Sequence, residues 1–167
     1  MTPEQGQLLC KVFADTMQSE SQTTKKVIRA IPEDRKSYKP EAVAKTAHEL
    51  AWHIVTAEVW LLDGILAGKF SMGEDPAAPP TIGGILEWYE TNYTDRVKRL
   101  NGLAADKLAT PISLFGVMEL PAAGYLNFLN LHTAHHRGQL STYLRPMGSK
   151  VPSIYGGSAD EPFQPPA

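Results

Sequence analysis

Four long segments of the sequence place apolar residues at the spacing of an α-helix. They run from about residue 3 to 30, 40 to 67, 81 to 101 and 121 to 144. The ends of these segments carry residues that start or stop helices. Pro3 suits a first helical position, Gly68 follows the second segment and Pro146 closes the fourth. The pattern predicts an all-α fold, a four-helix bundle that forms a single domain over residues 1–167.

The remaining stretches predict loops, with little regular structure between the helices. Residues 68–80 are rich in Gly and Pro and predict a loop. Residues 104–120 are mixed: 110–115 could be a short extended piece before a turn at Gly116, but no convincing strand is expected. The irregular tail after Met147 is too apolar at its start to be free, so we expect it to pack on the bundle, with 162–167 frayed.

Composition excludes several classes of protein. A chain of 167 residues with 43% hydrophobic and 20% charged residues is typical of one globular domain. The net charge of −2 argues against a nucleic-acid partner. The single cysteine, Cys10, excludes an internal disulfide, fits the cytoplasm, and is predicted to be a small buried apolar side chain. We expect no membrane partner, because no uninterrupted apolar run of about 18 residues and no secretory signal is seen.

The fourth segment carries three of the five histidines. His132 and His136 are four residues apart, so they lie on one helical face. That face also holds Tyr125, Phe128, Leu129, Gln139, Leu140 and Tyr143. Burying two imidazoles is unfavourable unless each finds a partner, and a shared divalent metal ion would serve both. A pair of His132 and His135 is an alternative, although His135 falls at the edge of the stripe, and a satisfied core pair is another.

A third metal ligand would have to come from another helix. His48 and His53 on the second segment are five residues apart, about 140° around a helix, and cannot share one target. His53 borders the apolar face, whereas His48 lies away from it and is expected to be solvent-facing or partly covered. The pattern therefore favours His53, and leaves open whether Glu58 pairs with a positive charge or lies near the site.

Other side chains are candidates for the surroundings of the site. Gln139 lies one turn after His136 and could orient a substrate or a bound water, or be an ordinary core amide. Arg137 is expected to point away from the stripe, toward a carboxylate on a neighbouring helix. Four aromatic residues are candidates either for a pocket lining or for plain core: Trp60, Tyr125, Phe128 and Tyr143.

Three stretches of the sequence resemble one known family. His53 followed by Ala57-Glu58-x-Trp60 is similar to its second-helix pattern, and His132-x-x-x-His136-Arg-Gly-Gln to its fourth-helix signature. The tail over residues 151–160 is similar to that of some members. The chain thus resembles the DinB/YfiT-like superfamily of metal-dependent enzymes. This resemblance implies a four-helix bundle, a homodimer, and one divalent ion, zinc or nickel, held by three histidines, here His53, His132 and His136.

The resemblance also implies a reaction. Some members transfer a low-molecular-weight thiol, such as bacillithiol or mycothiol, to a small-molecule substrate. Three imidazoles leave a position open on zinc, as in catalytic sites, where a thiol or water can lose its proton and act as a nucleophile. The sequence therefore predicts a metal-dependent enzyme that catalyses either thiol transfer or metal-assisted hydrolysis. The alternatives are a non-catalytic metal-binding or ligand-binding bundle, and a core cluster of histidines without metal.

Overall fold

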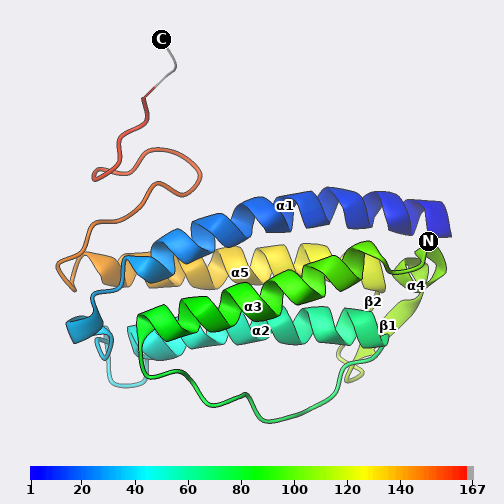
Figure 1. Ribbon diagram of the computed structural model, residues 1–167, viewed down its shortest axis with the longest axis horizontal. Coiled ribbons are helices and arrows are strands. Elements are labelled where there is room, and N and C mark those ends of the chain that lie inside the picture. The colour runs from blue at the N-terminus through cyan, green and yellow to red at the C-terminus, as the bar shows by residue number, and fades with distance from the viewer. Residues whose placement is uncertain (165–167) are drawn as a thin grey trace.

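Four long helices form the body of the protein in the computed structural model, which describes residues 1–164 (Figure 1). In chain order the elements are α1 (Pro3–Arg29), a 3-10 turn (Glu33–Arg35), α2 (Ala47–Ala67), α3 (Ile82–Asn101), α4 (Ala105–Ala109), β1 (Pro111–Leu114), β2 (Met118–Pro121) and α5 (Ala122–Leu144). The expected four-helix bundle is confirmed. The bounds of α1, α3 and α5 agree with the sequence prediction to within one residue.

The start of α2 lies later than the sequence suggested. A helix from residue 40 was expected, but residues 40–46 form turns and bends, and α2 begins at Ala47. Thr46 caps it, because its hydroxyl accepts a hydrogen bond from the backbone N–H of Glu49. The Glu49 carboxylate in turn accepts one from the backbone N–H of Thr46. The backbone N–H of Ala47 also donates to the Tyr38 carbonyl, at 2.8 Å. The preceding connection thus supplies a hydrogen-bond acceptor for a backbone N–H group in the first turn of α2. The helix ends at Gly68, whose φ of 69° requires glycine.

The expectation of no strand is wrong. β1 and β2 form a small antiparallel hairpin, in which Pro111 faces Pro121. Phe115 and Gly116 make the turn, both at positive φ, which the sequence signalled only through the glycine. The Tyr125 hydroxyl donates to the Ile112 carbonyl at 2.9 Å and so anchors the hairpin to α5. Short strands of this kind depend on such tertiary support, since an isolated hairpin is marginally stable.

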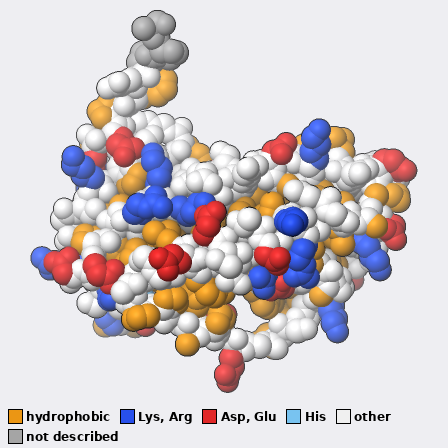
Figure 2. Space-filling view, viewed as in Figure 1, with side chains coloured by type: hydrophobic (Ala, Val, Ile, Leu, Met, Phe, Trp, Pro, Cys, Tyr) orange, Lys and Arg blue, Asp and Glu red, His pale blue; other side chains and the backbone are white. Residues whose placement is uncertain are grey.

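Helix α5 packs against both α1 and α2, and α2 packs against α3 (Figure 1). By length and composition α2 could cross a membrane, but 67% of its most apolar stretch is buried inside the bundle, as in the central helix of a packed core. The loop from residue 68 to 81 runs back along α2 before α3 begins, and Figure 2 shows a hollow at the lower edge of the molecule beside it.

A charged side chain, that of Arg137, lies buried in the centre of the bundle. Arg137 was expected to lie off the buried stripe, but its side chain is 1% exposed, because α1 covers the face of α5 that α2 leaves free. Its predicted carboxylate partner is confirmed as Glu20 of α1, at 2.5 Å. The guanidinium also donates to the Thr24 hydroxyl and to the backbone carbonyl of Glu20. An ion pair this deep needs such additional hydrogen bonds.

The C-terminal tail folds back on the bundle, as expected. Val151 and Ile154 pack against the core, and the Tyr155 hydroxyl donates to Glu20 at 2.8 Å. Arg145 pairs with Asp160 at 2.9 Å. The frayed end predicted for residues 162–167 lies partly outside the described residues.

Candidate metal centre

Three histidine side chains from two helices converge on one point. His53 comes from α2, and His132 and His136 come from α5, where their spacing of four residues stacks them on one face. Each offers one ring nitrogen, and the three nitrogens lie within 4.8 Å of one another. The Nε2 atoms of His53 and His136 are 3.2 Å apart. The structure therefore brings together the three histidines that the sequence singled out.

The geometry of this cluster fits a divalent ion. Two nitrogens bound tetrahedrally to one zinc, at about 2.0–2.1 Å each, lie about 3.3–3.4 Å apart, close to the observed Nε2 separation. Moreover, the Nδ1 atom of His132 is buried and has no hydrogen-bond partner among the described residues. A buried polar atom without a partner is unfavourable, and a metal ion bound to that nitrogen would remove the penalty. The donor set of three imidazoles suits zinc or nickel.

Burial keeps two of these rings neutral, which metal binding requires. Desolvation lowers the pKa of His132 to about 4, and the nearby His136 and His53 add to the effect. Desolvation also lowers the pKa of His53, followed by the effect of His136. Both imidazoles therefore present a free lone pair at neutral pH. An ion would meet little competition from protons at these two positions.

Gln139 supports one of the three rings. Its side-chain oxygen lies 3.1 Å from Nδ1 of His136 and accepts a hydrogen bond from it. This bond leaves Nε2 of His136 as the nitrogen that faces the cluster, as a partner on the far side of a ligating ring commonly does. Gln139 is exposed and is not the core amide considered from the sequence. Its predicted contact with a substrate stays a prediction.

The two other histidines near the site lie outside the cluster. The His48 ring donates to the Pro79 carbonyl at 2.8 Å and is half-buried, which agrees with the partly covered position expected for it. His135 is exposed on the flank of α5. The choice of His136 over His135 as the partner of His132 therefore agrees with the structure.

A buried carboxyl group lies behind the histidines. Glu58 accepts hydrogen bonds from the Tyr89 hydroxyl at 2.5 Å and the Thr133 hydroxyl at 2.7 Å. Thr133 is the residue after His132, so the network joins α2 and α3 to the back of the ligand helix. Burial raises the pKa of Glu58 to about 7. Sequence reasoning left its partners open. The signal was a carboxylate within an otherwise apolar stretch of α2.

A pocket of about 350 Å³ opens beside the cluster. Its walls come from α2, α5, β1 and the loop after α2, and its lining is His53, Thr56, Ala57, Trp60, Leu61, Met72, Gly73, Asp75, Leu114, Phe128 and His132. Of the aromatic candidates from the sequence, Trp60 and Phe128 line this pocket, whereas Tyr125 and Tyr143 are buried in the core. Because two of the three histidines lie in its wall, a small molecule in the pocket would reach the cluster.

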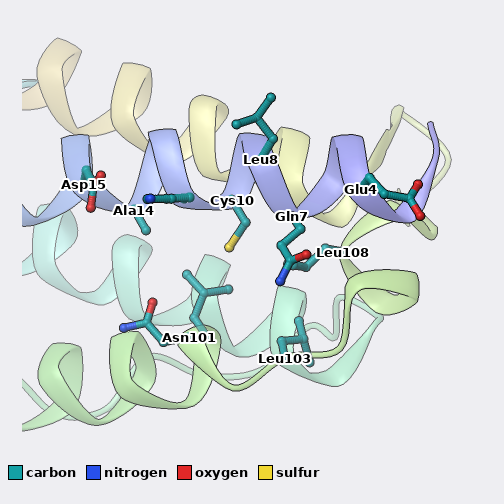
Figure 3. A pocket seen from close by; sticks show the side chains of 11 residues that line it. Glu4, Gln7, Leu8, Cys10, Ala14, Asp15, Asn101, Leu103 and Leu108 are labelled. Carbon is teal, nitrogen blue, oxygen red and sulfur yellow. The ribbon is translucent and has the colours of Figure 1, made fainter.

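A second cavity, of about 440 Å³, lies between the N-terminal half of α1 and the end of α3 (Figure 3). Cys10, Gln7 and Asn101 line it, and no histidine does so among the described residues. Burial raises the pKa of the Cys10 thiol, so this cysteine is a poor nucleophile at neutral pH. The prediction that Cys10 is a buried apolar side chain is confirmed, and the chemistry-bearing residues gather at the other pocket.

The fold and the site together define a helical bundle with a three-histidine cluster capable of holding one metal ion. Comparison with known proteins places the chain more narrowly. The DinB family matches residues 5–165, nearly the whole chain, and the protein belongs to that family. The family resemblance seen in the sequence is thereby confirmed.

Individual relatives agree with this placement. The uncharacterized protein YrdA of Bacillus subtilis (strain 168) is 28% identical over 157 residues, which cover 89% of each chain. A DinB-like protein from Bacillus cereus ATCC 10987 is 29% identical, with a TM-score of 0.74, over 86% of this chain and 95% of its own. The DinB-like protein YjoA of Bacillus subtilis has the same fold at 24% identity, with a TM-score of 0.69, over 86% and 96% of the two chains.

Proposed function

We propose that this protein is a metal-dependent enzyme that transfers a low-molecular-weight thiol to a small electrophile. His53, His132 and His136 would hold one zinc or nickel ion. The observation that carries the proposal is the convergence of their three ring nitrogens within 4.8 Å, with His53 and His132 in the wall of an open pocket. A structural metal site is closed by four protein ligands, whereas three ligands beside a pocket are typical of catalysis.

A bound divalent ion supplies the chemistry of lowering the pKa of a thiol, so that a sulfur nucleophile is present at neutral pH. The residues of the chain supply the rest. Gln139 fixes the orientation of the His136 ring. Trp60 and Phe128 give the pocket apolar walls. In the transfer, the sulfur forms a bond to the electrophilic carbon, the bond from that carbon to its leaving group breaks, and the thiol proton passes to solvent.

Thiol transfer is favoured over metal-assisted hydrolysis by the resemblance to the superfamily, some members of which transfer thiols. The apolar lining is a second argument, because a hydrolase must admit water beside its substrate. The pocket next to the histidines contains few polar groups apart from the imidazoles, Thr56 and Asp75.

The first experiment measures metal content by elemental analysis of protein purified without an affinity tag. We expect about one divalent ion per chain in the wild type and a large loss in His136→Ala. The matched control is His135→Ala, the neighbouring exposed imidazole on the same helix, which should keep its metal. Loss of the ion in His135→Ala alone, or no ion in the wild type after dialysis against zinc and nickel, would overturn the proposed site.

The second experiment measures the reaction. Zinc-loaded or nickel-loaded protein is mixed with cysteine or bacillithiol and with 1-chloro-2,4-dinitrobenzene, and release of chloride is followed together with the thioether. Acceleration that is lost in His136→Ala and kept in His135→Ala supports transfer. If the metal-loaded protein accelerates the reaction with neither thiol, and its ion has no exchangeable position, the protein is a non-catalytic metal-binding bundle. That result contradicts the proposal.

A further inference from the structure

Helices α2 and α5, which carry the three histidines, pack against each other in the bundle (Figure 1). Most of the side chains that they bury are apolar. Over residues 1–164, a single hydrogen bond joins side chains of these two helices outside the histidine cluster, and in it the Thr133 hydroxyl donates to Glu58 at 2.7 Å. Both side chains are buried, since Thr133 is 1% exposed and Glu58 is 2% exposed. This bond is therefore an isolated, directional contact between the helices.

The contact between Thr133 and Glu58 favours one register of α5 against α2. Apolar contacts have no preferred direction, so a helix that slides along its neighbour exchanges one aliphatic partner for another. The Glu58 carboxyl group does not tolerate such a slide, because its Oε1 atom accepts from Thr133 and its Oε2 atom accepts from Tyr89 of α3 at 2.5 Å. A slide of one turn, about 5.4 Å, would leave Oε1 and the Thr133 hydroxyl buried without partners, which is unfavourable. Fixing a helix register is a well-attested use of buried polar groups.

The register of these two helices decides whether the histidines meet. His53 lies five residues before Glu58, about 7.5 Å along the axis of α2, and His132 directly precedes Thr133 on α5. The polar contact is therefore close to the cluster on both helices. The cluster tolerates little movement, because the bond lengths of a zinc site vary by only about 0.2 Å. A shift of about 1 Å between the helices would weaken the hold of His53 on an ion bound by His132 and His136.

Two other buried polar contacts join helices of the bundle without joining α2 to α5. Tyr89 of α3 donates to Glu58 of α2. Arg137 of α5 pairs with Glu20 of α1. Tyr89 and Thr133 are thus a matched pair of donors, since each supplies one hydroxyl to the same buried carboxyl group. They differ in that only Thr133 belongs to a helix that carries histidines of the cluster.

We propose that Thr133 and Glu58 are a positioning pair for the metal centre, whose hydrogen bond holds α2 and α5 in the register at which His53 meets His132 and His136. Neither residue of the pair belongs to the ligand set. The inference rests on the proposed function only in taking a divalent metal ion as the group that the histidines bind. Without the Thr133 hydroxyl the protein should still fold, but its two histidine-bearing helices should occupy neighbouring positions and hold the ion less tightly.

The zinc affinity of full-length variants, measured by competition with a chromophoric chelator, tests the pair. Thr133→Val removes the hydroxyl and keeps the volume of the side chain. We expect it to weaken zinc binding by about tenfold or more, the usual effect of losing an outer-shell contact of a metal site. Tyr89→Phe is the matched control, because it removes the other hydrogen bond of Glu58 and should change zinc affinity by less than about threefold. Equal weakening in both variants, or none in Thr133→Val, would overturn the proposal.

Two further measurements separate positioning from general stability. Thr133→Ser keeps the hydroxyl and loses only a methyl group, so it should hold zinc within about threefold of the wild type, and it remains a test where Thr133→Val does not fold. With Co²⁺ in place of zinc, the visible absorption bands report the geometry of the ligands. They should shift in Thr133→Val and stay unchanged in Tyr89→Phe. A loss of about tenfold in Thr133→Ser would show that the hydroxyl is not responsible, and the proposal fails.

The register of the helices can also be followed without any metal. Spin labels attached to Ala67→Cys of α2 and Thr142→Cys of α5, both at exposed positions, report the separation of the two helices. Cys10→Ala in the same chain removes the native thiol. In metal-free protein we expect a broader distribution of label distances with Thr133→Val than with Tyr89→Phe. The same distribution in both variants would refute the role of Thr133 in the register.

The results separate this inference from the proposed function. If the wild type binds zinc and transfers thiols, but Thr133→Val behaves like Tyr89→Phe, the positioning pair is wrong and the function stands. If the wild type holds no zinc, but the label distances broaden in Thr133→Val alone, Thr133 does fix the register and it is the metal-dependent function that fails.

Discussion

The buried carboxyl group of Glu58 should make the folded protein less stable as the pH rises. Its side chain is fully enclosed, with the Tyr89 and Thr133 hydroxyls as its hydrogen-bond partners. Burial raises its pKa to about 7 and is the largest effect, and the negative charge of Glu20 adds to it. The two hydroxyls and Arg137 lower the pKa and offset only part of this rise. Between pH 4.5 and 7 the folded state therefore binds more protons than the unfolded chain does. Stability is present below the unfolded pKa and is lost as the pH rises through the folded one.

The size of this effect follows from the shift. The pKa rises from 4.5 to about 7, and each unit corresponds to about 1.4 kcal/mol, so the free energy of unfolding should fall by about 3 kcal/mol across this interval. Glu58→Gln removes the titration and keeps the shape and one accepting oxygen. The free energy of unfolding of the variant, relative to that of the wild type, should therefore rise by about 3 kcal/mol between pH 4.5 and pH 8.

The assay is urea unfolding of both proteins at several pH values from 4.5 to 8, with a chelator present so that metal binding adds no stability. His53 and His132 titrate with the opposite sign, since their lowered pKa values give stability above about pH 6.5 that is lost as the pH falls. They are present in both proteins, so their contribution cancels in the difference. A wild-type curve parallel to that of Glu58→Gln across the whole interval would refute the reasoning.

Two further substitutions test the packing. Arg137→Met removes the buried guanidinium from Glu20 and should lower the unfolding free energy by about 3–5 kcal/mol in urea titrations; a loss below about 1 kcal/mol would contradict the buried pair. Gly64→Ala places a Cβ 2.2 Å from the ring of the packed Phe70 and should destabilise by about 1–3 kcal/mol. Its control is Gly83→Ala, where no atom lies within 4 Å and thermal melting should show no loss. Equal effects at both glycines would count against the predicted clash.

The helices could be predicted because their signals are local. Pro3, Gly68 and Pro146 act on the backbone within one turn of their own positions, and they correctly marked the start of α1, the end of α2 and the end of α5. The early start predicted for α2 was wrong, because the residues before Thr46 carry a helical pattern that the cap and the contacts of Tyr38 override. The extended piece considered for residues 110–115 coincides with β1, but β2 and its pairing were missed for a related reason, since the hairpin depends on Tyr125 of α5.

The sequence by itself determined that His132 and His136 share a face, because a spacing of four residues fixes this in any α-helix. Only the tertiary structure decided that His53 meets them, since this depends on how α2 packs against α5. The tertiary structure also decided that Arg137 is buried, which the stripe pattern did not indicate. The physical reason is the same in both cases: periodicity shows which residues face together, whereas the burial of a polar group depends on partners that distant parts of the chain supply.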